Sequence, residues 1–247
     1  MALKVGSLYS NAIDGFAYAA KLLEMEVCWQ VELELSYHRY LNKNYPDSQK
    51  YRYDGYVGKR NLQSVDIICG GDPCQPHSYS GIRKGMSDNR YRWPEMFRII
   101  RELRPNWVVN ENVVGTISNM VLDQKVADLE SIGYSCQAFV LPAIATNAVH
   151  LRKRVFLIAH SDVRGWTGTL CYDKISINRA FKKANPLDTQ GNPFLQFQQS
   201  VGEPAVFPVD DGVSDRILRL GAAGDSIIST IPIILLGAIN EIEKTFN

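Results

Sequence analysis

The chain has 247 residues with a net charge of +1, and 45% of them are hydrophobic and 21% charged. This composition is typical of a folded protein with one large α/β domain and a small insertion, and it excludes a strongly basic protein, so any nucleic-acid surface must be local. The five cysteines form no Cys-x-x-Cys pair, which argues against a disulfide framework or a zinc site and indicates a reducing, cytoplasmic compartment. No apolar run reaches about 18 residues and no signal peptide is recognisable, so no membrane partner is expected.

Strand-like and helix-like patterns alternate along the first 160 residues. Strands are expected at 5–8, 27–33, 65–69, 107–109, 134–141 and 155–159, and helices at 16–24, 37–44, 94–103 and 123–132. A polar, tyrosine-rich loop is expected between the second helix and Lys59. Alternation at these lengths predicts an α/β fold with a doubly wound, Rossmann-like sheet.

The pattern changes after His160. Periodicity weakens over 161–210, where Gly, Asn, Gln and Pro accumulate, and a helical pattern returns over 216–242. We therefore expect a catalytic core at 1–160, a small irregular insertion at 161–210, and a C-terminal helical segment at 211–247 that packs back on the core. The apolar window 227–239 contains Ser229, Thr230 and Pro232, which favours a core helix over a membrane span.

A thiol follows the third clear strand, in the run Gly70-Gly-Asp-Pro-Cys74-Gln-Pro-His-Ser78. A lone cysteine is most often a buried core residue, and this is the expectation for Cys28 and Cys69 within strands. For Cys74, the Gly-Gly turn and the flanking prolines indicate a rigid loop at the edge where open α/β sheets place their chemistry.

Three further clusters are candidates for the same edge. Glu32 ends the second strand, where doubly wound folds bind a ribose diol. Glu111 follows another strand and suits acid–base chemistry, although Asn112 beside it could equally be a helix N-cap. Arg152 and Arg154 alternate, so they share one face and suit a carboxylate or phosphate, although a solvated charge run is the commoner explanation.

Together, and in this order, these motifs resemble those of the cytosine-C5 DNA methyltransferases, in particular small prokaryotic or phage-encoded members. The 70–78 run resembles the nucleophile loop, Glu111-Asn-Val the Glu-Asn-Val motif, and 150–159 the Arg-x-Arg motif. Segments 6–16 and 29–32 resemble the cofactor motifs, 87–96 the helix entry after the nucleophile loop, and 215–227 the last motif. The resemblance covers about 1–160 and 212–240.

This resemblance implies a methyl transfer from S-adenosylmethionine to a flipped-out cytosine of double-stranded DNA. Cys74 would add to carbon 6, Glu111 would hold N3 and the exocyclic amine, Arg152 would contact O2, and Arg154 would brace the loop or a phosphate. The cofactor residues implied are Tyr9, Ser10, Asn11, Ile13, Asp14, Glu32, Leu33, Asp54, Gly55, Asp72, Pro73, Asp225 and Ser226.

The chain departs from the family pattern at three places. The first motif retains only Gly15 of its glycines, and Asp225 replaces an asparagine, so weaker cofactor binding is expected. The recognition region at 161–210 is short, which predicts a target of a few base pairs or help from a second subunit or protein. Basic residues of 174–183 are candidates for phosphate contacts.

Three alternatives remain open. A tRNA cytosine-C5 methyltransferase would carry a Cys-Phe-Thr tripeptide, whereas Cys171 here precedes Tyr172. A catalytically impaired nucleic-acid-binding relative would fit the altered first motif, but it would not need Cys74 and Glu111. A pyrimidine-nucleotide methylase would need an arginine cluster for phosphate and a folate or donor site, and neither is recognisable.

Overall fold

A computed structural model describes residues 2–52, 57–73, 91–142, 153–161 and 230–246. The predicted site residues Cys74, Arg152, Asp54, Gly55, Asp225 and Ser226 lie outside these ranges. So do 162–210 of the expected insertion, the first part of the expected C-terminal helix, and residues 87–90 of the motif at 87–96.

Seven strands form one sheet in the order β3-β2-β1-β4-β5-β7-β6. They are β1 (Lys4–Leu8), β2 (Glu26–Val31), β3 (Gln49–Tyr51), β4 (Ile67–Gly70), β5 (Trp107–Val113), β6 (Ser135–Pro142) and β7 (Lys153–His160). Strands β1 to β5 are parallel to one another, and β7 is antiparallel to both β5 and β6.

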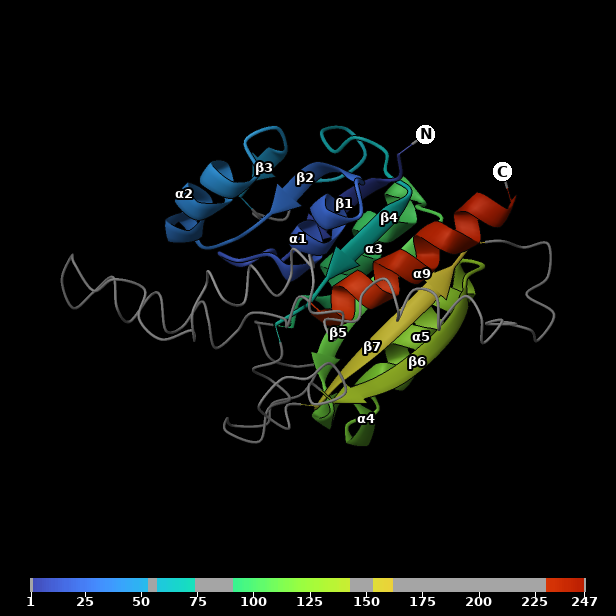
Figure 1. Cartoon of the computed structure of the whole chain (residues 1–247). Helices are drawn as coiled ribbons and strands as arrows, with labels where there is room; N and C mark the ends of the chain where they lie inside the picture. Colours follow the sequence, from blue (N-terminus) through green and yellow to red (C-terminus); the bar gives the residue numbers. More distant parts are fainter. Residues whose placement is uncertain (1, 53–56, 74–90, 143–152, 162–229, 247) are drawn as a thin grey trace.

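Helices cover both faces of the sheet (Figure 1). They are α1 (Gly15–Leu22), α2 (Leu35–Asn44), α3 (Trp93–Leu103), α4 (Gly115–Ser118), α5 (Val121–Ser131) and α9 (Thr230–Phe246). One apolar cluster joins α3 and α5 to the sheet, and a second joins α1 and α9 to its other face. The expected α/β doubly wound fold is therefore confirmed.

Local chemistry explains several element boundaries. Pro94 stands in the first turn of α3, where its missing N–H costs nothing, and Arg104 ends that helix in the left-handed conformation. The last residue of β4, Gly70, has to be glycine because a Cβ there would stand 2.8 Å from the Leu8 carbonyl oxygen. Within the described residues, no helix is long and apolar enough to cross a bilayer.

Two sequence expectations need correction. The tyrosine-rich loop contains β3, a three-residue edge strand whose polar, partly exposed residues give no apolar signal. Asn110-Glu111-Asn112 lies inside β5 rather than after it, because β7 pairs with these residues as far as Val113. The interpretation of Asn112 as a helix N-cap is therefore wrong, since the next helix, α4, has Val114 at that position.

The two strand cysteines have the structural role expected of them. Cys28 and Cys69 are both buried free thiols. Burial raises the pKa of Cys28 to about 12 and raises that of Cys69 as well. Neither thiol is therefore suited to act as a nucleophile near neutral pH.

Candidate active site

Four parallel strands deliver chemistry-bearing residues to one edge of the sheet. Tyr9 follows β1, Glu32 follows β2, Asp72 follows β4, and Glu111 lies in the last part of β5. Because these strands run parallel, their carboxyl ends share an edge, which is where doubly wound folds bind ligands.

The carboxylate of Glu111 lies between β7 and the segment that leads to Cys74. Its Oε1 is 2.8 Å from the Nε of Arg154, and both side chains are largely buried. Its Oε2 lies so close to Gly71 that a Cβ at that glycine would stand 3.0 Å from it. The structure thus brings Glu111, Arg154 and the beginning of the Gly-Gly-Asp-Pro-Cys run together, and Arg154 is ion-paired rather than part of a solvated charge run.

A buried polar network lies beneath this carboxylate. The ammonium of Lys125 donates to Asp72 Oδ1 at 2.5 Å and to Asn110 Oδ1 at 2.9 Å. The amides of Asn110 and Asn112 donate to the same Asp72 oxygen at 2.8 and 3.1 Å. Asp72 Oδ2 is buried and has no hydrogen-bond partner among the described residues.

Sequence reasoning missed Lys125, because lysine on a helix is usually solvated. Its side chain is 1% exposed, and it continues the buried stripe of α5 between Val121 and Leu129 at four-residue spacing. A charged residue in an otherwise apolar stripe was the available signal. The assignment of Asp72 and Pro73 to a cofactor stays a prediction, and the structure adds that the Asp72 carboxylate is held inside the protein.

Glu32 is held by backbone amides at the ends of β1 and β2. Its Oε2 accepts from Asn11 N–H at 2.7 Å, and its Oε1 accepts from Glu34 N–H at 2.8 Å. Burial raises the pKa of this carboxyl. Each carboxylate oxygen can accept a further hydrogen bond, so the pair suits the two hydroxyl donors of a ribose. The neighbouring Leu33 is 45% exposed and provides an apolar surface beside it.

The loop between β1 and α1 adopts left-handed backbone without glycine. Tyr9, Asn11 and Asp14 have φ values of 57°, 56° and 44°. Such a conformation is costly for residues with a Cβ and is normally supplied by glycine. The altered first motif therefore keeps a backbone conformation typical of glycine, but the residues that adopt it carry side chains.

Asp14 is the buried centre of a second network. Its carboxylate accepts from Ala17 N–H at 2.9 Å, which caps α1, and from Gln30 Nε2 at 2.6 Å and Ser7 Oγ at 3.1 Å. Burial raises the pKa of Asp14, although these hydrogen bonds oppose the shift. The first turn of α1 is thus already capped by a carboxyl group of the chain itself.

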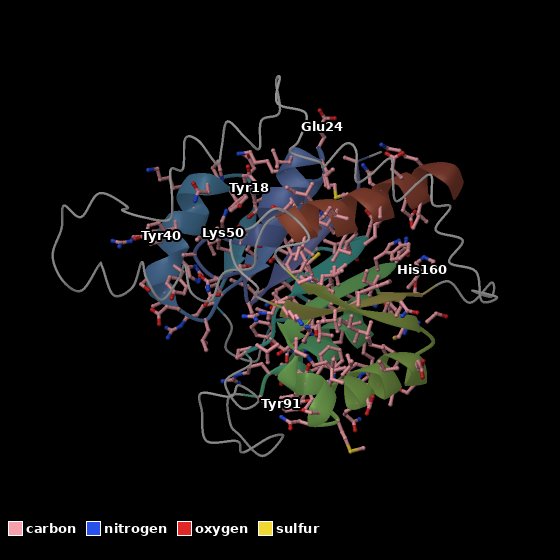
Figure 2. The ribbon with its side chains drawn as sticks, turned by 60° about the horizontal axis from the view of Figure 1, so that its bottom comes forward. Tyr18, Glu24, Tyr40, Lys50, Tyr91 and His160 are labelled. Carbon is pink, nitrogen blue, oxygen red and sulfur yellow. The ribbon has the colours of Figure 1, made fainter. Side chains whose placement is uncertain are left out.

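The remaining described cofactor candidates belong to the same loop. Ser10 is buried and its hydroxyl donates to the Ser7 carbonyl at 3.2 Å, while the Ile13 carbonyl accepts from Tyr45 Oη at 3.3 Å. Tyr9 Oη donates to the Arg92 carbonyl at 2.9 Å, which ties this loop to the residue before α3. Figure 2 shows Tyr91, next to that residue, far from Tyr40 and Lys50 at the β3 end of the sheet.

A model of the family described as C-5 cytosine-specific DNA methylase matches residues 3–198, which is most of the chain. The chain belongs to this family. Curated relatives include the type II methyltransferase M.AplI of Arthrospira platensis, 30% identical over 112 residues, which are 44% of this chain and 32% of the relative. M.HhaI of Haemophilus parahaemolyticus is 33% identical over 41% of this chain and 32% of its own length.

Other matches extend further along this chain. M1.HphI of Haemophilus parahaemolyticus is 27% identical over 175 residues, 66% of this chain and 47% of the relative. The chain thus spans about a third to a half of the length of these relatives. Solved structures share its fold, among them a putative prophage-encoded DNA modification methyltransferase from E. coli. That structure has a TM-score of 0.54 at 22% identity, over 65% of this chain and 47% of its own.

The Dnmt2 methyltransferase of S. pombe has a TM-score of 0.57 at 15% identity, over 77% of this chain and 56% of its own. At these identities the solved structures establish the fold of the chain alone, and its chemistry follows from its own residues.

Proposed function

We propose that this chain is a DNA cytosine-C5 methyltransferase that uses S-adenosylmethionine and forms a covalent adduct between Cys74 and its target base. One observation carries the proposal beyond family membership. Glu111, ion-paired with Arg154, lies against Gly71, three residues before Cys74. A carboxylate fixed beside the segment that carries a thiol is what addition to a cytosine ring requires.

The chemistry follows from the poor nucleophilicity of cytosine carbon 5. The Cys74 thiolate would add to carbon 6 while the Glu111 carboxyl gives a proton to N3 and accepts from the exocyclic amine, so that no uncompensated charge builds up on the ring and carbon 5 becomes electron-rich. S-adenosylmethionine, when bound, would supply the methyl group. Transfer of the carbon-5 proton to water would then expel the thiolate from carbon 6 and restore the aromatic ring, and N3 would return its proton to Glu111. Arg154 keeps the Glu111 carboxylate oriented, and Arg152 is assigned to O2 of the base.

The cofactor would be held at the carboxyl ends of β1 and β2. Glu32 suits the ribose hydroxyls, because each of its oxygens retains an acceptor position. The carboxyl of Asp14 already caps the beginning of α1 and would disfavour the carboxylate of the methionine end there, so we expect weaker binding than a glycine-rich loop would give. Calorimetry should show a large loss of binding in Glu32→Ala, and unchanged affinity would contradict this placement.

The decisive experiment uses a DNA duplex that contains 5-fluorocytosine. Fluorine cannot leave carbon 5 as a proton does, so the adduct persists and is seen as a protein–DNA band that survives denaturation. The parent should form this band in the presence of S-adenosylmethionine and Cys74→Ser should not. Cys136→Ser is the control, because Cys136 is a free thiol on β6 outside the proposed site.

Three results would overturn the proposal. They are a band that Cys74→Ser still forms, no band on any cytosine-containing duplex, or a band formed only with RNA.

A further inference from the structure

The buried ammonium of Lys125 contacts one residue on each side of the nucleophile segment, residues 74–90. Before that segment, it is ion-paired with Asp72 at 2.5 Å. After it, the ammonium lies 5.0 Å from the ring centroid of Trp93, the first residue of α3. The same ammonium donates to Asn110, which precedes Glu111 in β5.

From these contacts we infer that Lys125 is a positioning residue, which holds both ends of the nucleophile segment in fixed relation to Glu111. A hydrophobic side chain at this place in α5 would fill the space, but it would connect none of the three. The second neighbour of the ammonium is also anchored to α5, because Trp93 Nε1 donates to Asp128 Oδ2 at 2.8 Å. Helix α5 therefore contacts Trp93, after the segment, through Lys125 and Asp128, and it contacts Asp72, before the segment, through Lys125 alone.

Stability alone does not explain the buried ion pair between Lys125 and Asp72. Two charges withdrawn from water gain little stability over well-packed apolar groups, so a buried ion pair is weak evidence for a purely stabilising role. Here Asp72 Oδ1 accepts from Lys125, Asn110 and Asn112, which fixes its place relative to β5 from several directions. The backbone carbonyl of Asp72 also accepts from Asn112 at 3.2 Å. Catalysis by a positioned thiol is sensitive to displacements of about 1 Å.

The test separates folding from positioning with two variants. Lys125→Met keeps the length of the side chain but leaves Asp72 without its cation, and this variant can fail to fold. The double variant Lys125→Met with Asp72→Asn removes both charges together and should fold, but it lacks the ammonium that joins Asp72, Asn110 and Trp93. The control is Lys244→Met, which removes an exposed partner of Glu241 on α9.

In the double variant we expect kcat to fall at least tenfold, while KM for DNA stays within threefold of the parent. Its melting temperature should stay near that of the parent, and Lys244→Met should change none of these values. A double variant with the kcat of the parent would overturn the role of Lys125, as would a loss confined to KM.

The influence of Lys125 on kcat rests on the proposed methyl transfer, whereas its hold on the segment does not. Alkylation by iodoacetamide therefore supplies a readout without DNA. The rate at Cys74, followed by peptide mass spectrometry, should rise at least threefold in the double variant, while the rate at Cys136 stays unchanged. If the parent methylates no DNA but the alkylation rate rises, the proposed function fails and the anchoring stands. An unchanged rate at Cys74 would refute the anchoring itself.

Discussion

At the scale of single residues, the Glu111 carboxylate is the group on which the proposed chemistry depends most. Replacement by Gln keeps its size but removes the charge that balances Arg154 and the group that can protonate N3 of the ring during thiol addition. Loss of such an electrostatic partner typically costs about 100-fold or more in rate. Glu111→Gln should therefore lower kcat by about that factor in a methyl-incorporation assay, with Glu241→Gln on α9 as the neutral control. A rate within about twofold of the parent would contradict the role.

Asp14 offers a second test at this scale, through the pH dependence of stability. Its pKa is raised by burial, so the folded state is favoured while the carboxyl is protonated, and this contribution is lost as pH rises through the raised pKa. Asp14→Asn cannot ionise. It keeps its hydrogen bonds if the Gln30 amide turns over, because the Ser48 hydroxyl that now donates to Gln30 can accept instead.

We therefore expect the free energy of unfolding of Asp14→Asn, relative to that of the parent, to be most favourable near pH 7. This advantage should shrink as pH falls toward the ordinary aspartate value of 3.8. Urea unfolding at both pH values measures it. A difference that is constant with pH, or one that grows on acidification, would show that the carboxylate is not destabilised by its burial.

At the scale of elements, the pairing of β1 with β2 depends on the absence of a side chain at Gly6. A Cβ there would stand 2.1 Å from the indole of Trp29, which is buried and donates to the Gln63 carbonyl. Gly6→Ala should therefore lower the free energy of unfolding by about 1–3 kcal/mol through overpacking.

Gly237 in α9 is the matched control, because a Cβ there would meet only Leu23 at an ordinary 3.8 Å. Gly237→Ala should stabilise the helix by about 0.5–1 kcal/mol. Chemical denaturation of both variants decides the matter, and a Gly6→Ala protein as stable as the parent would mean that the indole moves freely.

The elements also show what the sequence could predict. Buried strands and amphipathic helices have a clear period, so β1, β2, β4 and the long helices were expected close to their observed places. The edge strand β3 and the one-turn helix α4 have no such period. The extent of β5 depends on its pairing with β7, which is a tertiary contact.

The candidate site divides in the same way. Glu32 was named as a candidate because the end of its strand is visible in the sequence, whereas Glu111 was named although its strand continues to Val113. The partners of Asp72 come from β5 and α5, 38 to 53 residues away, and only the folded chain brings them together.

At the scale of the whole molecule, the proposed recognition insertion at 161–210 has to supply DNA contacts that a net charge of +1 does not supply globally. Its basic residues Lys174, Arg179, Lys182 and Lys183 are the candidates for phosphate contacts. Each phosphate that they neutralise should add about 0.9 to the slope of log affinity against log salt.

Affinity for a short duplex should accordingly fall steeply with salt. Replacing the four basic residues by serine should flatten that slope by up to about 3.6. Serine at Lys21 and Lys244, on the helices α1 and α9, should leave the slope unchanged.

Bisulfite mapping of a methylated plasmid then shows whether the methylated sequences change when the basic residues of the insertion are replaced. An unchanged slope together with unchanged sites would place recognition elsewhere. A long, strict target sequence read by the isolated monomer would remove the need for a second subunit, because about 50 residues leave room for few base contacts.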